Sequence, residues 1–183
     1  MAAPILTADL SDLIGLFYNT PDELGRFDSV PASEVPQPYH ELLCHRHHMT
    51  VTVEHFHQSP VDVRVLQRRT TGDIYARKIL LPRHTDGRIV LFGIVRMNFA
   101  AIDPQVRQEI ESESIPLGRV LINHSILRQI ELLSLWRVTP SPELSQFFQL
   151  SSPRITYGRT AVIHLNGQPT IELLEIVTPL DNI

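Results

Sequence analysis

The most constraining feature of the sequence is a set of short segments in which apolar and polar residues alternate, separated by residues that favour turns. Alternation with a period of two places every second side chain on the same face of a β-strand. It predicts four strands in the first half of the chain, at residues 49–57, 61–66, 74–81 and 89–99. Turns are expected between them at residues 58–60, 70–73 and 85–87. Short strands joined by such turns indicate an antiparallel meander.

The chain before this meander predicts a helix and an irregular lead-in. Apolar residues recur at helical spacing over residues 6–17, and Asp9 or Ser11 is the expected cap. Four prolines follow, at positions 21, 31, 36 and 38. Because proline lacks an N–H and restricts its neighbours, regular structure is not expected again until about Tyr39.

The chain after the meander predicts further helices and a final hairpin. Helices are expected at residues 103–114, from Val120 onward and at 140–148, and a strand in the second half of residues 126–138. Asp103 is a suitable cap and Pro104 a suitable first helical residue. Asn166-Gly167 is a strong turn signal between strands at 155–165 and 170–178. These elements predict one α+β domain over residues 1–183, with an antiparallel sheet of about six strands and helices on one face.

Composition excludes several classes of protein. The chain has 183 residues, 43% of them hydrophobic, and a net charge of −4, which suits one folded domain without the basic surface of a nucleic-acid binder. It has no apolar run of the ~18 residues that a membrane helix needs, and its start lacks the basic residues of a secretory signal. We therefore expect a cytoplasmic protein that binds neither nucleic acid nor membrane. The sequence does not indicate its oligomeric state.

Arg77 is the first residue that suggests chemistry. In the predicted third strand it shares a face with Tyr75, Ile79 and Leu81. An arginine in an apolar stripe is unfavourable unless it meets an anion, and its planar guanidinium suits a carboxylate. An internal ion pair or an exposed face would explain the same pattern.

The last predicted strand carries two carboxylates. Glu172 and Glu175 are three residues apart and therefore face opposite sides of the sheet. One of them must face the helices, where burial favours a protonated carboxyl suited to proton transfer. A structural ion pair with an arginine is again the alternative.

Three other groups are weaker signals. Residues 116–119 (Pro-Leu-Gly-Arg) form a turn whose backbone N–H groups, at a following helix start, favour an anion. Cys44 is expected to be a buried structural thiol. A histidine group comprises His45, His47, His48, His55 and His57. Its role is left open between a polar surface and ligands for zinc or iron.

Taken in order, these segments resemble the chorismate lyase (chorismate pyruvate-lyase) family. The matching blocks are residues 48–50, 75–81, 116–119, 157–159, 166–169 and the glutamate at 175. The resemblance extends from about His48 to Pro179, whereas residues 1–38 match poorly. It implies a six-stranded antiparallel sheet with helices on one side and a ligand enclosed between them beneath two flaps. It also implies removal of pyruvate from chorismate to leave 4-hydroxybenzoate, with no metal or organic cofactor.

The resemblance also implies roles for individual residues. Arg77 corresponds to the arginine that grips the ring carboxylate of the substrate. Met49 and Leu117, with Gly118 beside it, correspond to the residues that complete this grip. Glu175 corresponds to the carboxylate at the opposite end of the ring, where a protonated carboxyl would assist departure of the ether oxygen. The expected catalytic residues are therefore Arg77 and Glu175.

Two other functions are compatible with these residues. The same fold serves as the effector-sensing domain of a class of transcription regulators, so the chain is also compatible with a non-catalytic sensor of a small aromatic or other anionic metabolite. A metal-dependent enzyme built on His45, His47, His55 and His57 is the third hypothesis. The expected partner in the first two cases is a small molecule, either chorismate or a related aromatic carboxylate.

Overall fold

The computed structural model describes residues 7–126 and 128–180 and contains a seven-stranded antiparallel sheet. Its strands are β1 (Gly25–Val30), β2 (Arg64–Thr71), β3 (Ile74–Pro82), β4 (Ile89–Asn98), β5 (Arg128–Pro140), β6 (Thr156–Leu165) and β7 (Gln168–Val177). Its α-helices are α1 (Leu10–Gly15), α2 (Tyr39–Leu43), α3 (Met49–His57), α4 (Pro104–Glu111), α5 (Leu117–Asn123) and α6 (Pro142–Phe147). Within the described ranges, no helix has the length and apolar character needed to cross a membrane.

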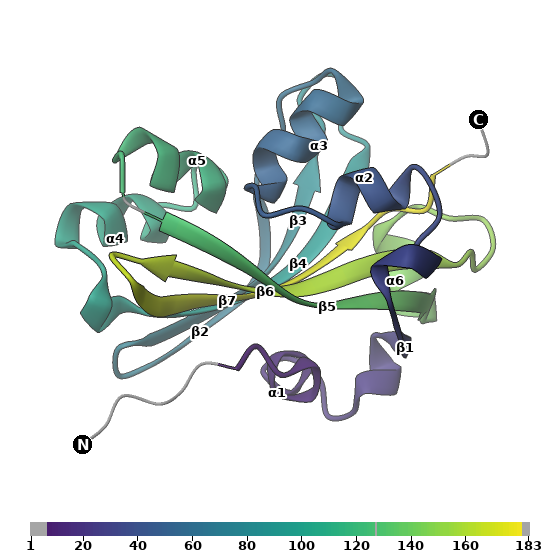
Figure 1. Cartoon of the computed structure of the whole chain (residues 1–183), viewed down its shortest axis with the longest axis horizontal. Coiled ribbons are helices and arrows are strands. Elements are labelled where there is room, and N and C mark those ends of the chain that lie inside the picture. The colour runs from purple at the N-terminus through teal and green to yellow at the C-terminus, as the bar shows by residue number, and fades with distance from the viewer. Residues whose placement is uncertain (1–6, 127, 181–183) are drawn as a thin grey trace.

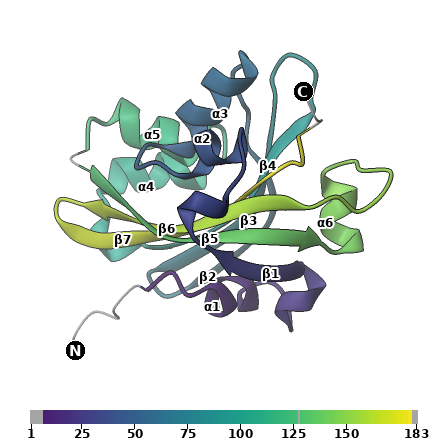
Figure 2. The same cartoon turned by 45° about the vertical axis from the view of Figure 1, so that its right-hand side comes forward.

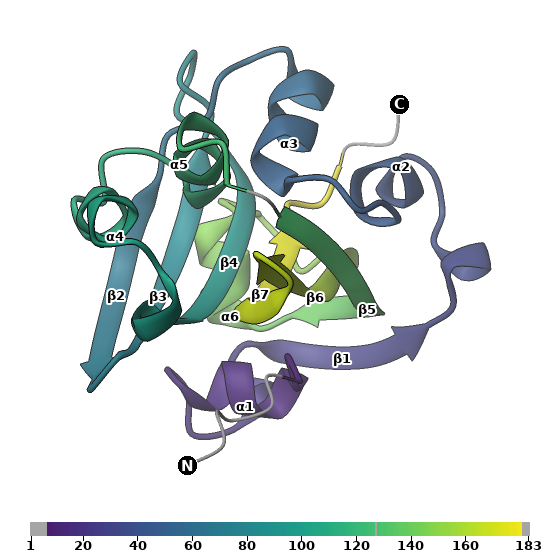
Figure 3. The ribbon, with the colours of Figure 1, turned by 60° about the vertical axis from the view of Figure 1, so that its left-hand side comes forward.

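The strand order across the sheet is β1-β5-β6-β7-β4-β3-β2. The last three strands of the predicted meander form its β2-β3-β4 half, although the strand expected at 61–66 lies at 64–71. The hairpin around Asn166-Gly167 forms β6 and β7 in its centre. Figure 3 shows these strands following one another across the twisted sheet. At the far edge, β1 pairs with β5, as Figure 2 also shows. The expected turns at residues 70–73, 85–87 and 166–167 are therefore confirmed as hairpin connections, whereas residues 58–60 follow helix α3.

Helices cover both faces of the sheet. In Figure 1, α2, α3, α4 and α5 lie on one side and α1 lies on the other. Two apolar clusters fill the space beneath the first group, one of them under α4 and α5 and the other under α2 and α3. A third cluster joins α1 and α6 to the opposite face. The predicted α+β class is confirmed. The sheet has seven strands rather than about six, and α1 and α6 cover the face for which no helix was expected.

The predicted strand at residues 49–57 is wrong, because this segment is helix α3. Its valines and threonines alternate as in a strand, but Met49 and Val53 also stand four residues apart, as helical neighbours do. Both are fully or almost fully buried, against the sheet. Packing of this stripe outweighs the β-propensity of the branched residues. The helix ends at Gln58, which adopts a left-handed conformation with φ 50°.

The expected irregular lead-in before Tyr39 is also wrong in part, because residues 25–30 form strand β1. The four prolines flank this strand and do not enter it. Since β1 lies at the edge of the sheet and pairs only with β5, it needs no apolar residues on both faces. A six-residue segment with one partner strand leaves a weak sequence signal.

The predicted helix caps are confirmed, while two other boundaries shift. The Asp9 side chain accepts a hydrogen bond from the N–H of Asp12, and Asp103 accepts one from Gln105 at 2.8 Å. Helix α5 begins at Leu117 rather than after Val120. Strand β5 occupies all of residues 128–140, not only the second half of the expected segment.

Candidate functional site

Two adjacent rows of residues cross the sheet face beneath α2–α5 and contain its buried charged side chains, Arg77, Arg159 and Glu175. The first row is Leu135, Arg159, Glu175, Gly93 and Ile79. The second row is Ala161, Leu173, Val95 and Arg77. Arg77 on β3 and Glu175 on β7 therefore share this face, separated by one strand and by two residues along it.

A cavity of about 40 Å³ lies between this face and the beginnings of α3 and α5, and we call it the chamber. It is lined by His48, Met49, Thr50, Ile79, Leu81, Leu91, Gly93, Val95, Pro116, Leu117, Gly118, Ile130, Arg159, Ile163, Leu173 and Glu175. Most of these side chains are apolar, and the charged ones come from β6 and β7. The chamber is therefore an enclosed apolar space with polar groups on its floor, as is typical of small-molecule sites.

Four of the five predicted site residues line the chamber. Met49 comes from the first turn of α3, Leu117 and Gly118 from the first turn of α5, and Glu175 from the floor. The fifth, Arg77, is not among the lining residues, although its strand neighbour Val95 is.

Two glycines allow the walls of the chamber to approach each other. A Cβ at Gly118 would lie 2.7 Å from Oγ1 of Thr50, so this glycine lets the start of α5 pack directly on the start of α3. Gly93 pairs with both Ile79 and Glu175, and a Cβ there would lie 3.2 Å from Cγ1 of Ile79. The absence of a side chain at 93 leaves the space between these two residues open to the chamber.

Arg77 is fully buried, with an exposed fraction of 0%. Its Nη1 donates a long hydrogen bond of 3.3 Å to the carbonyl of Ile110, at the end of α4. Its Nε and Nη2 have no hydrogen-bond partner in the described part of the protein. The nearby Tyr75 hydroxyl donates instead to Glu113. Burial lowers the pKa of Arg77 below its usual value, and Tyr75 and Glu113 only partly offset this effect. An internal ion pair therefore does not account for this arginine.

Glu175, by contrast, has an internal partner. The Nε of Arg159 on β6 donates to its Oε2 at 2.7 Å, and Arg159 is also fully buried. The alternative of a structural ion pair with an arginine is therefore realised at Glu175. Sequence reasoning did not assign Arg159 to the site. The available signal was its place in the strand that pairs with Glu175 and in the matching block at 157–159.

Arg159 also binds the segment 43–47, which connects α2 to α3. Its Nη1 donates to the carbonyl of His45 at 2.9 Å, and its Nη2 donates to the carbonyl of His47 at 3.2 Å. Burial, followed by the charge of Arg159, lowers the pKa of His45 to about 4. This part of the histidine group is thus neutral near pH 7 and lies against a cation.

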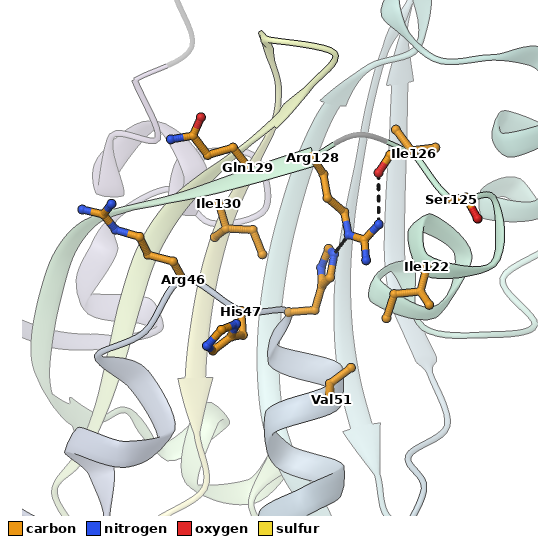
Figure 4. Close-up of a pocket in the computed structure, with 10 residues that line it drawn as sticks. Arg46, His47, Val51, Ile122, Ser125, Ile126, Arg128, Gln129 and Ile130 are labelled. Carbon is orange, nitrogen blue, oxygen red and sulfur yellow. Dashed lines mark hydrogen bonds between the residues drawn. The ribbon is translucent and has the colours of Figure 1, made fainter.

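His48 forms the boundary between the chamber and a surface cleft of about 780 Å³. Nε of Arg128 donates to Nε2 of His48, so the neutral imidazole carries its proton on Nδ1. Burial, followed by the charge of Arg128, lowers the pKa of His48 to about 4. Figure 4 shows Arg128 reaching across the cleft, with its second hydrogen bond to the carbonyl of Ile126, while Arg46 lies on the other side. Neither arginine has a carboxylate partner among the described residues, so the cleft is cationic.

The remaining residues considered above lie outside the chamber. Glu172 faces α1 and is paired with Arg96, as expected for the opposite side of the sheet from Glu175. Cys44 is half-buried, and burial raises the pKa of its thiol. His55 and His57 lie in the last turn of α3, not on a strand. In residues 7–126 and 128–180, no three His, Cys, Asp or Glu side chains gather as metal ligands.

The fold and site define an α+β domain with an enclosed chamber between sheet and helices. No protein-family model and no curated protein matches the sequence. Similar solved structures include PhnF from Mycobacterium smegmatis, with 9% identity over 72% of this chain and 63% of that one and a TM-score of 0.49. A GntR-family transcriptional regulator from Enterococcus faecalis has 12% identity over 67% and 98% of the two chains and a TM-score of 0.47. The ligand-binding domain of a protein described as a GntR-family regulator, from Bordetella bronchiseptica, has 11% identity over 67% and 92%, with a TM-score of 0.46.

Proposed function

We propose that the chamber binds a small aromatic carboxylate and that Arg77 is its anion anchor. The observation that carries this proposal is the guanidinium of Arg77, which is fully buried with two of its three nitrogens unpartnered in the described structure. A buried cation without a counter-charge costs several kcal/mol, on the order of the penalty for desolvating an ion. A carboxylate that accepts from Nε and Nη2 together supplies both the charge and the two missing acceptors.

The chamber walls suit a flat ring. Leu173, Val95 and Ile79 form an apolar floor between Arg77 and Glu175. The first turn of α5 adds the N–H groups of Leu117 and Gly118, which have no acceptor within the helix. A volume of about 40 Å³ is smaller than an aromatic acid requires, and Arg77 does not line the chamber in this form. The starts of α3 and α5 must therefore move apart to admit the ligand and to bring its carboxylate to Arg77.

The reaction we propose is the elimination of pyruvate from chorismate. In this reaction the hydrogen on C4 of the ring leaves as a proton, the C3–O bond breaks, and the ring becomes aromatic. The departing enolpyruvate takes up a proton in exchange and becomes pyruvate, so that no other reactant is needed. The enzyme needs mainly to orient the substrate and exclude water, which an arginine clamp and apolar walls provide. Support comes from the order of the matching blocks and from Met49, Leu117 and Glu175, which line one chamber.

The pair with Arg159 changes the role we propose for Glu175. A carboxylate that receives a guanidinium hydrogen bond is favoured in its ionised form, which accepts hydrogen bonds and does not donate them. Glu175 is therefore proposed to accept the hydrogen bond of the hydroxyl group para to the ligand carboxylate, in place of the proton-donating role expected from the sequence.

The same ion pair favours the second candidate function, a non-catalytic sensor. With Glu175 engaged by Arg159, and His48 neutral and bonded to Arg128, the titratable residues that line the chamber are all suited to binding. A sensor needs only the anchor, the acceptor and the enclosed space.

One experiment distinguishes these functions. Purified protein is titrated with 4-hydroxybenzoate by calorimetry and is separately incubated with chorismate while 4-hydroxybenzoate is followed by absorbance. Product formation that is lost in Arg77→Met but kept in Arg64→Met, a control on exposed β2, supports the lyase. Binding without product supports the sensor. If neither chorismate nor 4-hydroxybenzoate binds, both proposals fail.

A further inference from the structure

The sheet carries two buried Arg–Glu pairs on opposite faces. Arg159 and Glu175 meet on the chamber face, whereas Arg96 and Glu172 meet on the face covered by α1. In each pair one member has an exposed fraction of 0%, Arg159 in the first and Glu172 in the second. The pairs are thus matched in type but only one of them adjoins the chamber.

Arg159 uses all three of its guanidinium nitrogens. Nε donates to Glu175, while Nη1 and Nη2 donate to backbone carbonyls of the segment 43–47, among them those of His45 and His47. This segment continues into His48 and Met49, which form part of the chamber wall. One side chain therefore connects the floor of the chamber to the segment that positions its wall.

We infer that Arg159 is a positioning residue, which holds the Glu175 carboxylate in its orientation toward the chamber and fixes the segment that leads into Met49. This inference rests on the proposed function, since it assigns Arg159 a role at the same site. A buried carboxylate without a cation is driven to take up a proton, and an adjacent arginine counters this.

Within residues 7–126 and 128–180, no other charge near Glu175 performs this task. The titratable residues that line the chamber are His48, Arg159 and Glu175. His48, and His45 on the far side of Arg159, are neutral above about pH 5 because burial lowers the pKa of each to about 4. Arg77 lies one strand away and its bonded nitrogen contacts the carbonyl of Ile110, not Glu175. Arg159 is therefore the cation in direct contact with Glu175.

The test uses carbon-13 NMR of the glutamate side chains at pH 7, with the Glu175 signal assigned by its loss in Glu175→Gln. Spectra are compared for wild type, Arg159→Gln, Arg159→Lys and the matched control Arg96→Gln. We expect the Glu175 carboxyl signal to shift in Arg159→Gln, because its guanidinium donor is gone, and to stay near the wild-type position in Arg159→Lys and Arg96→Gln. An unmoved Glu175 signal in Arg159→Gln overturns the inference, because a purely structural arginine would affect stability alone.

Arg159→Lys provides the second measurement should Arg159→Gln fail to fold. A lysine retains the charge, but its single ammonium cannot reach Glu175 and two carbonyls in the same geometry. Amide hydrogen exchange over residues 43–48 should therefore accelerate about tenfold or more in this variant and remain unchanged in Arg96→Gln. Unaltered exchange would show that Arg159 does not fix the segment that leads into Met49.

Both measurements are made without ligand. A failure of 4-hydroxybenzoate to bind would therefore refute the proposed function, while these two results would still decide the role of Arg159.

Discussion

Replacement of Arg77 by methionine should make the protein more stable and less able to bind. Each unpartnered guanidinium nitrogen in the buried site costs about 1–3 kcal/mol, and the substitution removes two of them. It also removes one long hydrogen bond to the carbonyl of Ile110, worth roughly 1 kcal/mol. The net gain in the free energy of unfolding is about 1–5 kcal/mol, comparable with the gain of about 1–4 kcal/mol found when buried ionic groups are replaced by apolar ones of similar size.

The same substitution removes the proposed anchor, so the affinity for 4-hydroxybenzoate should fall by about 2–4 kcal/mol, or roughly 30- to 1000-fold. Thermal unfolding without ligand should shift upward by several degrees, since ~1 kcal/mol corresponds to about 2–4 °C in a chain of this size. Calorimetric titration measures the affinity. Arg64→Met, on the exposed edge strand, should change neither quantity.

Arg159→Met supplies the contrasting result for a buried arginine that has partners. It should destabilise the protein, because it leaves the Glu175 carboxylate and two backbone carbonyls without their donor. If Arg77→Met lowers stability as much as Arg159→Met and leaves 4-hydroxybenzoate affinity unchanged, Arg77 is a structural cation and the reasoning about the chamber is refuted.

Three further predictions concern other parts of the site. Glu175→Gln should weaken 4-hydroxybenzoate binding and chorismate turnover together, because it removes the carboxylate proposed to accept the hydrogen bond of the para hydroxyl group. An unchanged affinity would remove this glutamate from the site. His48 is held neutral by burial and by Arg128, with a pKa of about 4 in the folded protein against about 6.5 in the unfolded chain. The free energy of unfolding should therefore be unaffected by His48 above pH 6.5 and should decrease as the pH falls from 6.5 toward 4. Urea unfolding measured between pH 4 and pH 6.5 should show a free energy of unfolding that depends less on pH in His48→Gln than in wild type. The same pH dependence in both proteins would contradict the lowered pKa of His48. Gly118→Ala should lower both the stability of the protein and its affinity for 4-hydroxybenzoate, because the new Cβ would lie 2.7 Å from Oγ1 of Thr50. A Cβ at Gly15 would have no atom within 4 Å, so Gly15→Ala is the control that should change neither thermal unfolding nor the binding titration.

The sheet could be predicted largely from sequence because its hairpins depend on local signals. Turn residues such as Asn166-Gly167 fix both the loop and the register of the strands beside it. Strand alternation also placed Arg77 on one face with Tyr75, Ile79 and Leu81, and it placed Glu172 and Glu175 on opposite faces without deciding which of them meets Arg77. In the structure it is Glu175 that shares the face of Arg77 beneath α2–α5. Which helices cover that face depends on contacts between distant segments, and a local pattern does not contain them.

The two main errors in the fold arise where local and tertiary preferences differ. The valines and threonines of residues 49–57 favour a strand by themselves, but Met49 and Val53 gain more by packing on the sheet as one helical stripe. Strand β1 carries few apolar residues because its place at the edge requires few.

The charged part of the site shows the same limit. The sequence indicated that Glu175 could pair with an arginine, but it did not indicate which one. Arg159 lies on another strand, and its other hydrogen-bond partners, Leu43, His45 and His47, are separated from it by 112 to 116 positions in the sequence. Two nitrogens of Arg77 are unpartnered because no acceptor from another part of the described fold lies within hydrogen-bond distance of them. The sequence around Arg77 alone could not predict this, because it does not show which distant residues surround the side chain.

The small size of the chamber has a kinetic consequence. With room for about one or two water molecules between the sheet and the starts of α3 and α5, the form described here cannot admit a ring by diffusion alone. A ligand can then bind only after the two helices have separated spontaneously. The observed binding rate in stopped-flow experiments should therefore reach a plateau as the ligand concentration rises. That plateau would measure how often the protein opens, whatever aromatic acid is supplied.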